Sequence, residues 1–349
     1  MDIQRILILL GLAVTAYLLI LAWNEDYGVN SRNLPVETVE STIQEATVDV
    51  VPETTTVAES DVVPQLAEEN HPTARPEVVR RRLVTVVTDV LDLQIDLNGG
   101  DIVRVALPKY PATLETPEIP FLLVDPRNSY VAQSGLIGRD GTDRTGSRPG
   151  FTVDVDRYEM NAAEELKVTL RYQQESGAEI LKHFLFKRGS YLVQLEYEIA
   201  AAEDQEWRGA LFTQIKRDGQ MPFSFSESMM GMRPYVGGAT RSGDELYRKL
   251  EFDDLEDESY KLTREDGYIA LVEHYFVTAW VPADGEVNNY QARKLKGQDL
   301  YLFGFTTPAI SVPAAGRSTL GAQYYVGPKD QYVMREIAEG LELTVDYGF

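Results

Sequence analysis

Apolar residues follow three different patterns along this chain, and each pattern predicts a different structure. Residues 6–23, ILILLGLAVTAYLLILAW, form a run without a charged side chain. From residue 83 onward, short segments alternate apolar and polar residues, as β-strands with one buried face do. Near residue 330 the apolar spacing becomes that of an amphipathic helix. We therefore expect an apolar helix, then a β-rich domain, then a terminal helix.

The first run is long enough to cross a membrane. At about 1.5 Å per residue it spans roughly 27 Å, whereas a signal peptide core has only ~7–15 apolar residues. Polar and acidic residues follow Trp23, where a cleavage site would carry small ones. Arg5 before the run predicts a cytoplasmic N-terminus and a main domain across the membrane. We favour a retained anchor over a cleaved signal and assign to it Ile6, Leu10, Val14, Leu18 and Trp23.

Residues 24–82 have the composition of a linker. Between residues 24 and 77 acidic side chains are frequent, and Arg32 and Arg75 are the only basic ones. Prolines recur through the segment, and it has no periodic apolar face to bury. Such a chain repels itself and stays hydrated, so we expect a disordered, extended tether.

The alternation that follows predicts a mainly β domain over residues 83–327. In LDLQIDL, residues 91–97, every second side chain is apolar, and NGGD at 98–101 suits a hairpin turn. The pattern returns at 167–172 and 191–199. The runs at 267–281 and 300–305 are apolar enough to lie between two layers. We expect two packed antiparallel sheets with one large core.

The end of the chain predicts a single helix over residues 328–341. Pro328 suits the first turn of a helix and Gly340 suits its end. Four apolar residues share one helical face and are expected to dock on the sandwich: Val333, Met334, Ile337 and Leu341. Residues 342–349, where apolar and polar residues alternate again, would start a connection to a further part.

Charge and composition narrow the partners. A net charge of −22 and a pI near 4.6 argue against nucleic acid and against adhesion of the β domain to anionic lipid. The chain has no cysteine, which excludes disulfides and thiolate metal sites.

Candidate chemistry is sparse, and we assign no catalytic, cofactor-binding or metal-binding residue. His71 lies in the tether, and His183, His274 and Glu273 are the only set that could perform acid–base chemistry at a sugar ring. Ordinary sheet positions are the favoured interpretation of these three residues. The glycine-rich residues 135–150 lack the Lys-Ser/Thr ending of a phosphate loop, so a surface loop is expected.

Two further segments have a plain interpretation and a functional one. Met229, Met230 and Met232 could offer an adaptable contact to a partner chain, although a loop packed over the core is favoured. Residues 251–260, EFDDLEDESY, lack the ligand spacing of a calcium loop and predict a solvated acidic loop.

Several motifs occur in the order found in one protein family. They are MDIQRILILLGLAV at 1–14, LDLQIDLNGGDIVRVALPKYP at 91–111, QSGLIGRDG at 133–141, FKRGSY at 186–191, YFVTAWVP at 275–282 and LTVDYG at 343–348. By these motifs the chain resembles the YidC/Oxa/Alb family of membrane protein insertases, in its Gram-negative form. The resemblance covers the whole chain outside the linker.

The resemblance implies a fold and a domain plan. Family members have an uncleaved first helix, a periplasmic β-supersandwich similar to galactose mutarotases, and a C-terminal helix. These correspond here to residues 1–5 in the cytoplasm, 6–23 in the membrane, 24–82 as linker, 83–327 as sandwich, 328–341 as helix and 342–349 as connection. Family members continue into five further membrane helices with a groove arginine, which no residue here matches. We expect this chain to be the first part of such a protein.

The resemblance also implies a function. The family inserts, folds and assembles integral proteins of the cell inner membrane, alone or with the Sec translocon. The implied partners are the translocon with its SecD and SecF subunits, nascent membrane proteins and the lipid bilayer; no cofactor is implied. The alternative, by fold analogy alone, is a membrane-tethered carbohydrate-binding or mutarotase-like module.

Overall fold

A computed structural model describes residues 82–144, 146–220, 235–243 and 245–345. The predicted anchor with Ile6, Leu10, Val14, Leu18 and Trp23 lies outside these ranges, as do the linker up to residue 81, His71 and the three methionines at 229–232. Within the described ranges, no helix is both long and apolar enough to span a membrane.

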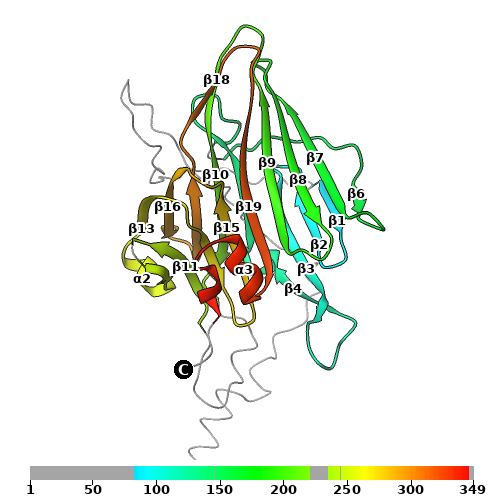
Figure 1. Cartoon of the computed structure of the whole chain (residues 1–349), viewed down its shortest axis with the longest axis vertical. Helices are drawn as coiled ribbons and strands as arrows, with labels where there is room; N and C mark the ends of the chain where they lie inside the picture. The colour runs from blue at the N-terminus through cyan, green and yellow to red at the C-terminus, as the bar shows by residue number, and fades with distance from the viewer. Residues whose placement is uncertain (1–81, 145, 221–234, 244, 346–349) are drawn as a thin grey trace, which may run out of the picture. The chain divides into compact units, whose positions relative to one another are not determined.

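Two β-sheets face each other across one core (Figure 1). The larger sheet has eleven strands, nine of them in the order β13-β16-β17-β10-β5-β3-β2-β1-β6, with β18 paired to β10 and β4 paired to β3. The smaller sheet has eight strands in the order β12-β11-β14-β15-β19-β9-β8-β7. The pairs are antiparallel except β1–β6, which is parallel. The predicted mainly β fold of packed antiparallel sheets is confirmed.

The strands of the larger sheet are β1 (Leu83–Val87), β2 (Asp92–Asp96), β3 (Asp101–Pro111), β4 (Pro120–Val124), β5 (Val131–Ile137), β6 (Arg157–Glu159), β10 (Trp207–Asp218), β13 (Tyr260–Glu265), β16 (Val287–Lys294), β17 (Leu300–Thr306) and β18 (Ile310–Val312). Those of the smaller sheet are β7 (Glu165–Gln173), β8 (Glu179–Lys187), β9 (Leu192–Ala200), β11 (Gly237–Ser242), β12 (Glu245–Leu250), β14 (Ile269–Val272), β15 (Phe276–Pro282) and β19 (Arg317–Pro328). The helical elements are η2 (Pro126–Asn128), α2 (Phe252–Asp257), α3 (Gln331–Ile337) and η4 (Leu341–Thr344).

The sequence pattern explains which face of each strand is buried. Along β9 every second side chain is buried, and the buried ones join the core between the sheets. Strands β14 and β15 are buried on both faces, which accounts for the unbroken apolar run predicted between two layers. Gly99 and Gly100 adopt positive φ between β2 and β3, so the predicted hairpin turn is confirmed.

Two predictions were wrong: the loop expected at residues 251–260 and the bounds of the C-terminal helix. Residues 251–260 are not a loop, because Phe252 and Leu255 bury one side of the short helix α2 before β13 begins. The helix predicted over 328–341 is shorter, since Pro328 is the last residue of β19 and still pairs with Phe276. The Asp330 carboxylate accepts the N–H groups of the first turn and starts α3 at Gln331.

The glycine-rich segment was only partly predicted. Residues 135–137 complete β5, and the described residues between 138 and 150 form a loop. Asp143 and Arg148, however, are buried instead of exposed, because they belong to an ion cluster inside the fold.

Candidate functional site at the C-terminal docking face

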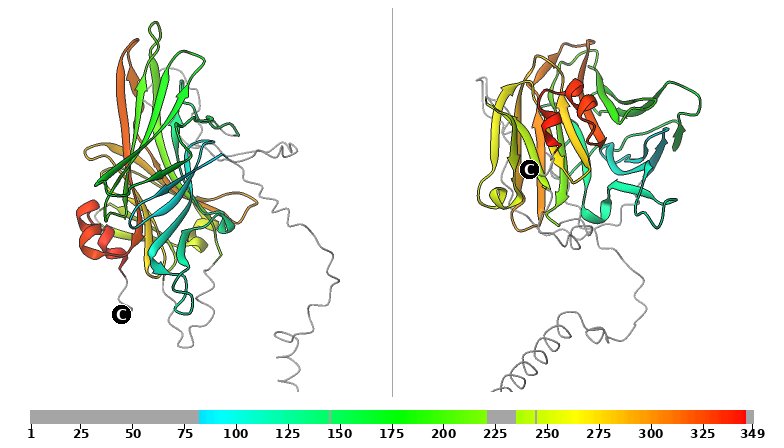
Figure 2. Two further views of the ribbon diagram at one scale, coloured as in Figure 1. Left: turned by 90° about the vertical axis from the view of Figure 1, so that its right-hand side faces the viewer. Right: turned by 60° about the horizontal axis from the view of Figure 1, so that its bottom comes forward.

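The C-terminal elements α3 and η4 cover the outer surface of the smaller sheet, on the side away from the larger sheet (Figure 2). We call this covered surface the docking face. Its side chains come from β11, β14, β15 and β19 and from the residue before β14, and they are small or apolar: Ala239, Tyr268, Ala270, Val272, Val277, Ala279, Val281 and Tyr325. Their neighbours in the same strands point the other way, into the main core.

The structure places the four predicted docking residues differently. Met334 and Leu341 are fully buried in the docking face, and Ile337 packs against it while partly buried. Val333 keeps 41% of its surface exposed. A helical step turns the side chain by about 100°, so Val333 is rotated off the face that Met334 presents.

A hydrogen-bonded latch, made by Tyr268, Gly340 and Leu246, accompanies this packing. The Tyr268 hydroxyl lies 3.0 Å from the Gly340 carbonyl oxygen and 3.2 Å from that of Leu246. Burial raises the pKa of Tyr268, so the hydroxyl stays protonated as a donor. At the surface, Arg241 Nη1 lies 2.8 Å from a Glu339 oxygen. These contacts join the C-terminal segment to β11, to β12 and to the residue before β14.

Helical spacing in the sequence could not identify the latch, because its donor lies far from the helix along the chain. Tyr268 was visible only as one more apolar residue in the run at 267–281. Gly340 was expected as a helix end, and it instead takes φ +90° as the residue before η4.

A second polar feature, the ion cluster, lies inside the fold. Arg148 Nη2 lies 2.8 Å from Asp101 Oδ1, and Arg148 Nε donates to Asp143 Oδ1 at 2.5 Å. Lys182 Nζ reaches from β8 to the carbonyl oxygens of Gly99 and Ser134, at 3.0 and 3.1 Å. All four charged side chains are buried, so the cluster connects the 138–150 loop to both sheets.

Burial gives Lys182 an unusual acidity. It lowers the pKa of the Lys182 ammonium to about 7, although the nearby Asp101 and Asp143 carboxylates oppose the shift. A signal existed in the sequence, since Lys182 shares the inward face of β8 with Ile180 and Phe184. A lysine on an apolar face needs buried acceptors, and the sequence did not show which residues supply them.

The candidate acid–base set does not converge. His183 pairs through Glu196 with Gly321 of β19, whereas His274 lies beyond the other end of β19, where Phe276 pairs with Pro328. Seven residues of strand separate those levels, or about 23 Å. The structure therefore does not form the site that mutarotase-like chemistry would need from these residues.

Each member of that set has another partner. His183 Nδ1 lies 3.0 Å from Thr169 Oγ1, and burial lowers the pKa of His183. Glu273 accepts a hydrogen bond from Arg217 at 3.0 Å, and burial raises the pKa of Glu273. His274 stacks on the ring of Tyr275.

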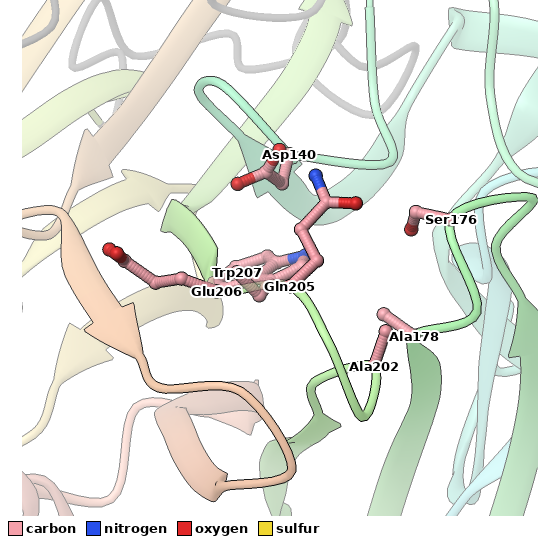
Figure 3. A pocket seen from close by; sticks show the side chains of 7 residues that line it. All are labelled: Asp140, Ser176, Ala178, Ala202, Gln205, Glu206 and Trp207. Atoms are coloured by element: carbon pink, nitrogen blue, oxygen red, sulfur yellow. The ribbon is translucent and has the colours of Figure 1, made fainter.

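A small pocket, drawn in Figure 3, lies where the β7–β8 and β9–β10 connections meet. This is the end at which β19 begins, whereas α3 follows the other end of β19. The pocket is lined by Asp140, Ser176, Ala178, Ala202, Gln205, Glu206 and Trp207. Its empty space is about 180 Å³ including open solvent, less than the ~300 Å³ at which ligand pockets begin. The Trp207 indole already donates to Gln174 at 3.1 Å. Among the described residues there is also no cluster of three metal-ligating side chains.

Comparisons with known proteins give a consistent family. Residues 83–349 match the model of the YidC periplasmic domain. The membrane protein insertase YidC of Stutzerimonas stutzeri is 41% identical over 352 residues, covering 100% of this chain and 62% of the relative. The same-named protein of Alcanivorax borkumensis is 38% identical over 362 residues, with the same coverage. The chain thus spans about three fifths of the length of these curated relatives.

Solved structures with a similar arrangement are distant in sequence. A galactose mutarotase related enzyme from Lactobacillus acidophilus has a TM-score of 0.44 at 10% identity, covering 70% of this chain and 97% of its own. A galactose mutarotase-like protein from Lactobacillus casei has a TM-score of 0.45 at 8% identity, covering 70% and 99%.

Proposed function

Because this chain belongs to the YidC family, we propose that it is the anchored periplasmic part of a membrane protein insertase and chaperone. Residues 6–23 would hold it in the inner membrane with the N-terminus in the cytoplasm, and the sandwich would lie in the periplasm. The whole protein would aid insertion, folding and assembly of integral membrane proteins, alone or beside the Sec translocon with SecD and SecF. This work involves no bond chemistry in the sandwich.

The docking of α3 and η4 is the observation that carries our proposal for the sandwich. Met334 and Leu341 are fully buried on the docking face, and the Tyr268 hydroxyl holds the Gly340 carbonyl. A segment held by both packing and a buried hydrogen bond moves with the sheet beneath it. We propose that it braces the sandwich against the membrane part of the insertase, so that the two keep a fixed relation while a client is inserted.

The test is Met334→Asp in the complete insertase that contains this chain. An aspartate there would bury an unpaired carboxylate in an apolar face, at a cost of about 3 kcal/mol or more. We expect a lower urea midpoint for the sandwich and reduced insertion of a single-spanning inner-membrane client. Leu343→Asp is the matched control, because Leu343 belongs to η4 and is 46% exposed, so it should tolerate the charge.

A milder variant separates bracing from folding. Tyr268→Phe removes the latch hydroxyl while its ring still fills the docking face, so the sandwich should lose only about 1–3 kcal/mol. We expect faster amide exchange across residues 331–345 together with slower client insertion. If both Met334→Asp and Tyr268→Phe left insertion at the wild-type rate, the proposal that α3 and η4 brace the sandwich would be wrong.

The carbohydrate alternative gains no support from a specific observation. His183 lies far from Glu273 and His274, and Glu273 accepts a hydrogen bond from Arg217.

A further inference from the structure

Exposed apolar side chains gather at the end of the sandwich where α3 begins. Nine large hydrophobic side chains are exposed among the described residues, and five of them belong to three segments near this end. They are Leu114, Ile119, Tyr275, Tyr332 and Val333, with Leu114 95% exposed and Tyr332 77% exposed. We call the surface formed by these five residues the apolar end.

Aromatic packing brings the three segments together. Phe276 stacks on Phe121 at 4.4 Å and meets Tyr110 edge-on at 5.3 Å. Those two rings flank the 112–119 loop, and Tyr275 is adjacent to Phe276 in the chain. The Tyr275 carbonyl accepts the Lys329 N–H just before α3. Figure 1 shows the β3–β4 loop and α3 at this end of the domain.

We infer that the apolar end rests on the bilayer surface, with Leu114 and Ile119 entering the headgroup region of zwitterionic lipid. Tyrosine rings suit that boundary because the ring is apolar and the hydroxyl stays hydrated. This inference rests on the proposed anchor, which would keep the domain within reach of lipid and so raise the effective lipid concentration.

The charges at this end limit how the contact forms. Glu115 and Glu118 lie between Leu114 and Ile119 in the loop, and the chain has a net charge of −22. Anionic headgroups would repel them, and a carboxylate costs too much to enter hydrocarbon. The contact is therefore shallow and apolar, and the carboxylates stay at headgroup level.

Site-specific labels test the inference, because the chain has no native cysteine. The 349-residue chain would be placed in phosphatidylcholine nanodiscs, with a nitroxide on Leu114→Cys in one sample and on Val287→Cys in another. Val287 is a matched control, since it is 48% exposed. Val287 is the first residue of β16. At the other end of β16, Lys294 pairs with Tyr301, which pairs with Arg217, and Arg217 contacts Glu273 beside the apolar end. Seven residues of strand separate Val287 from Lys294, or about 23 Å.

We expect the label at 114 to relax several-fold more with oxygen than with a water-soluble nickel chelate, and the label at 287 to show the reverse. Equal nickel access at both positions would overturn the inference while leaving the anchor intact. A chain that failed to enter the nanodiscs would overturn both the anchor and the inference.

Discussion

At the scale of single residues, two cations share the same pair of carbonyl oxygens. Arg148 Nη2 and Lys182 Nζ both lie within 3.4 Å of the Gly99 and Ser134 oxygens. Both side chains are buried, and two carboxylates balance them. Buried ion clusters rarely add net stability, but removing one member leaves the others unpaired. The cluster therefore fixes the position of the 138–150 loop more than it strengthens the core.

Replacing Arg148 with methionine should be strongly destabilising. Asp101 and Asp143 would stay buried without their main counter-charge, at a cost of about 3–5 kcal/mol. Urea unfolding followed by circular dichroism, in mild detergent, measures the loss. Arg317→Met is the control, because Arg317 and Glu198 form an exposed pair that is worth at most about 1 kcal/mol. A loss below 1 kcal/mol for Arg148→Met would contradict a charged cluster.

Lys182 should make stability depend on pH. Burial lowers the pKa of folded Lys182 from 10.5 to about 7, so between these values the unfolded chain binds the extra proton. The free energy of unfolding therefore rises with pH in this window, by at most about 1.4 kcal/mol per pH unit. We expect the free energy of unfolding of the wild type, minus that of Lys182→Met, to rise from pH 6 to pH 9. Parallel pH profiles would show that Lys182 keeps its proton.

At the scale of elements, local pattern predicted the strands well and the C-terminal segment less well. Alternation along 91–97 and 191–199 identified β2 and β9, because each strand buries one face. The predicted start of the helix was wrong, because Pro328 pairs with Phe276 in the sheet, and helical spacing does not reveal that partner. The docking of Val333 was predicted wrongly for a different reason, because two turns of helix do not fix which side chains face the sheet.

Gly340 should be the least replaceable residue of the C-terminal segment. It has φ +90°, and a Cβ there would lie 2.1 Å from the Leu246 carbonyl oxygen. Gly340→Ala must therefore push η4 away from β12, which we expect to cost at least about 2 kcal/mol and to raise amide exchange at 331–345.

Gly297→Ala is the control for Gly340→Ala, because it has the backbone strain of a positive φ without the collision of the new Cβ. Gly297 has φ +74°, and a Cβ there would meet nothing within 4 Å, so only the left-handed backbone penalty of about 1 kcal/mol applies. Equal losses for the two variants, measured by urea midpoint, would mean that η4 is not seated against β12.

At the scale of the whole domain, the order of strands in the sheets could not be predicted from the sequence. β10 pairs with β5 and β17, which lie far apart along the chain, and nothing in local periodicity selects such partners. The ion cluster and the buried hydrogen bond between Tyr130 and Thr278 cross between the sheets in the same way. One continuous core then contains side chains from both sheets.

A shared core predicts that the two sheets unfold together. Trp207 in the larger sheet and Trp280 in the smaller sheet are each 1% exposed, so each indole reports on its own sheet. With Trp23 replaced by Phe, the variants Trp207→Phe and Trp280→Phe would each keep one reporter. We expect each variant's fluorescence midpoint in urea to coincide with its own circular dichroism midpoint, because neither sheet can bury its inner face alone. A fluorescence transition of Trp280 that preceded the loss of circular dichroism would mean that the smaller sheet, with its docking face, opens as a separate unit.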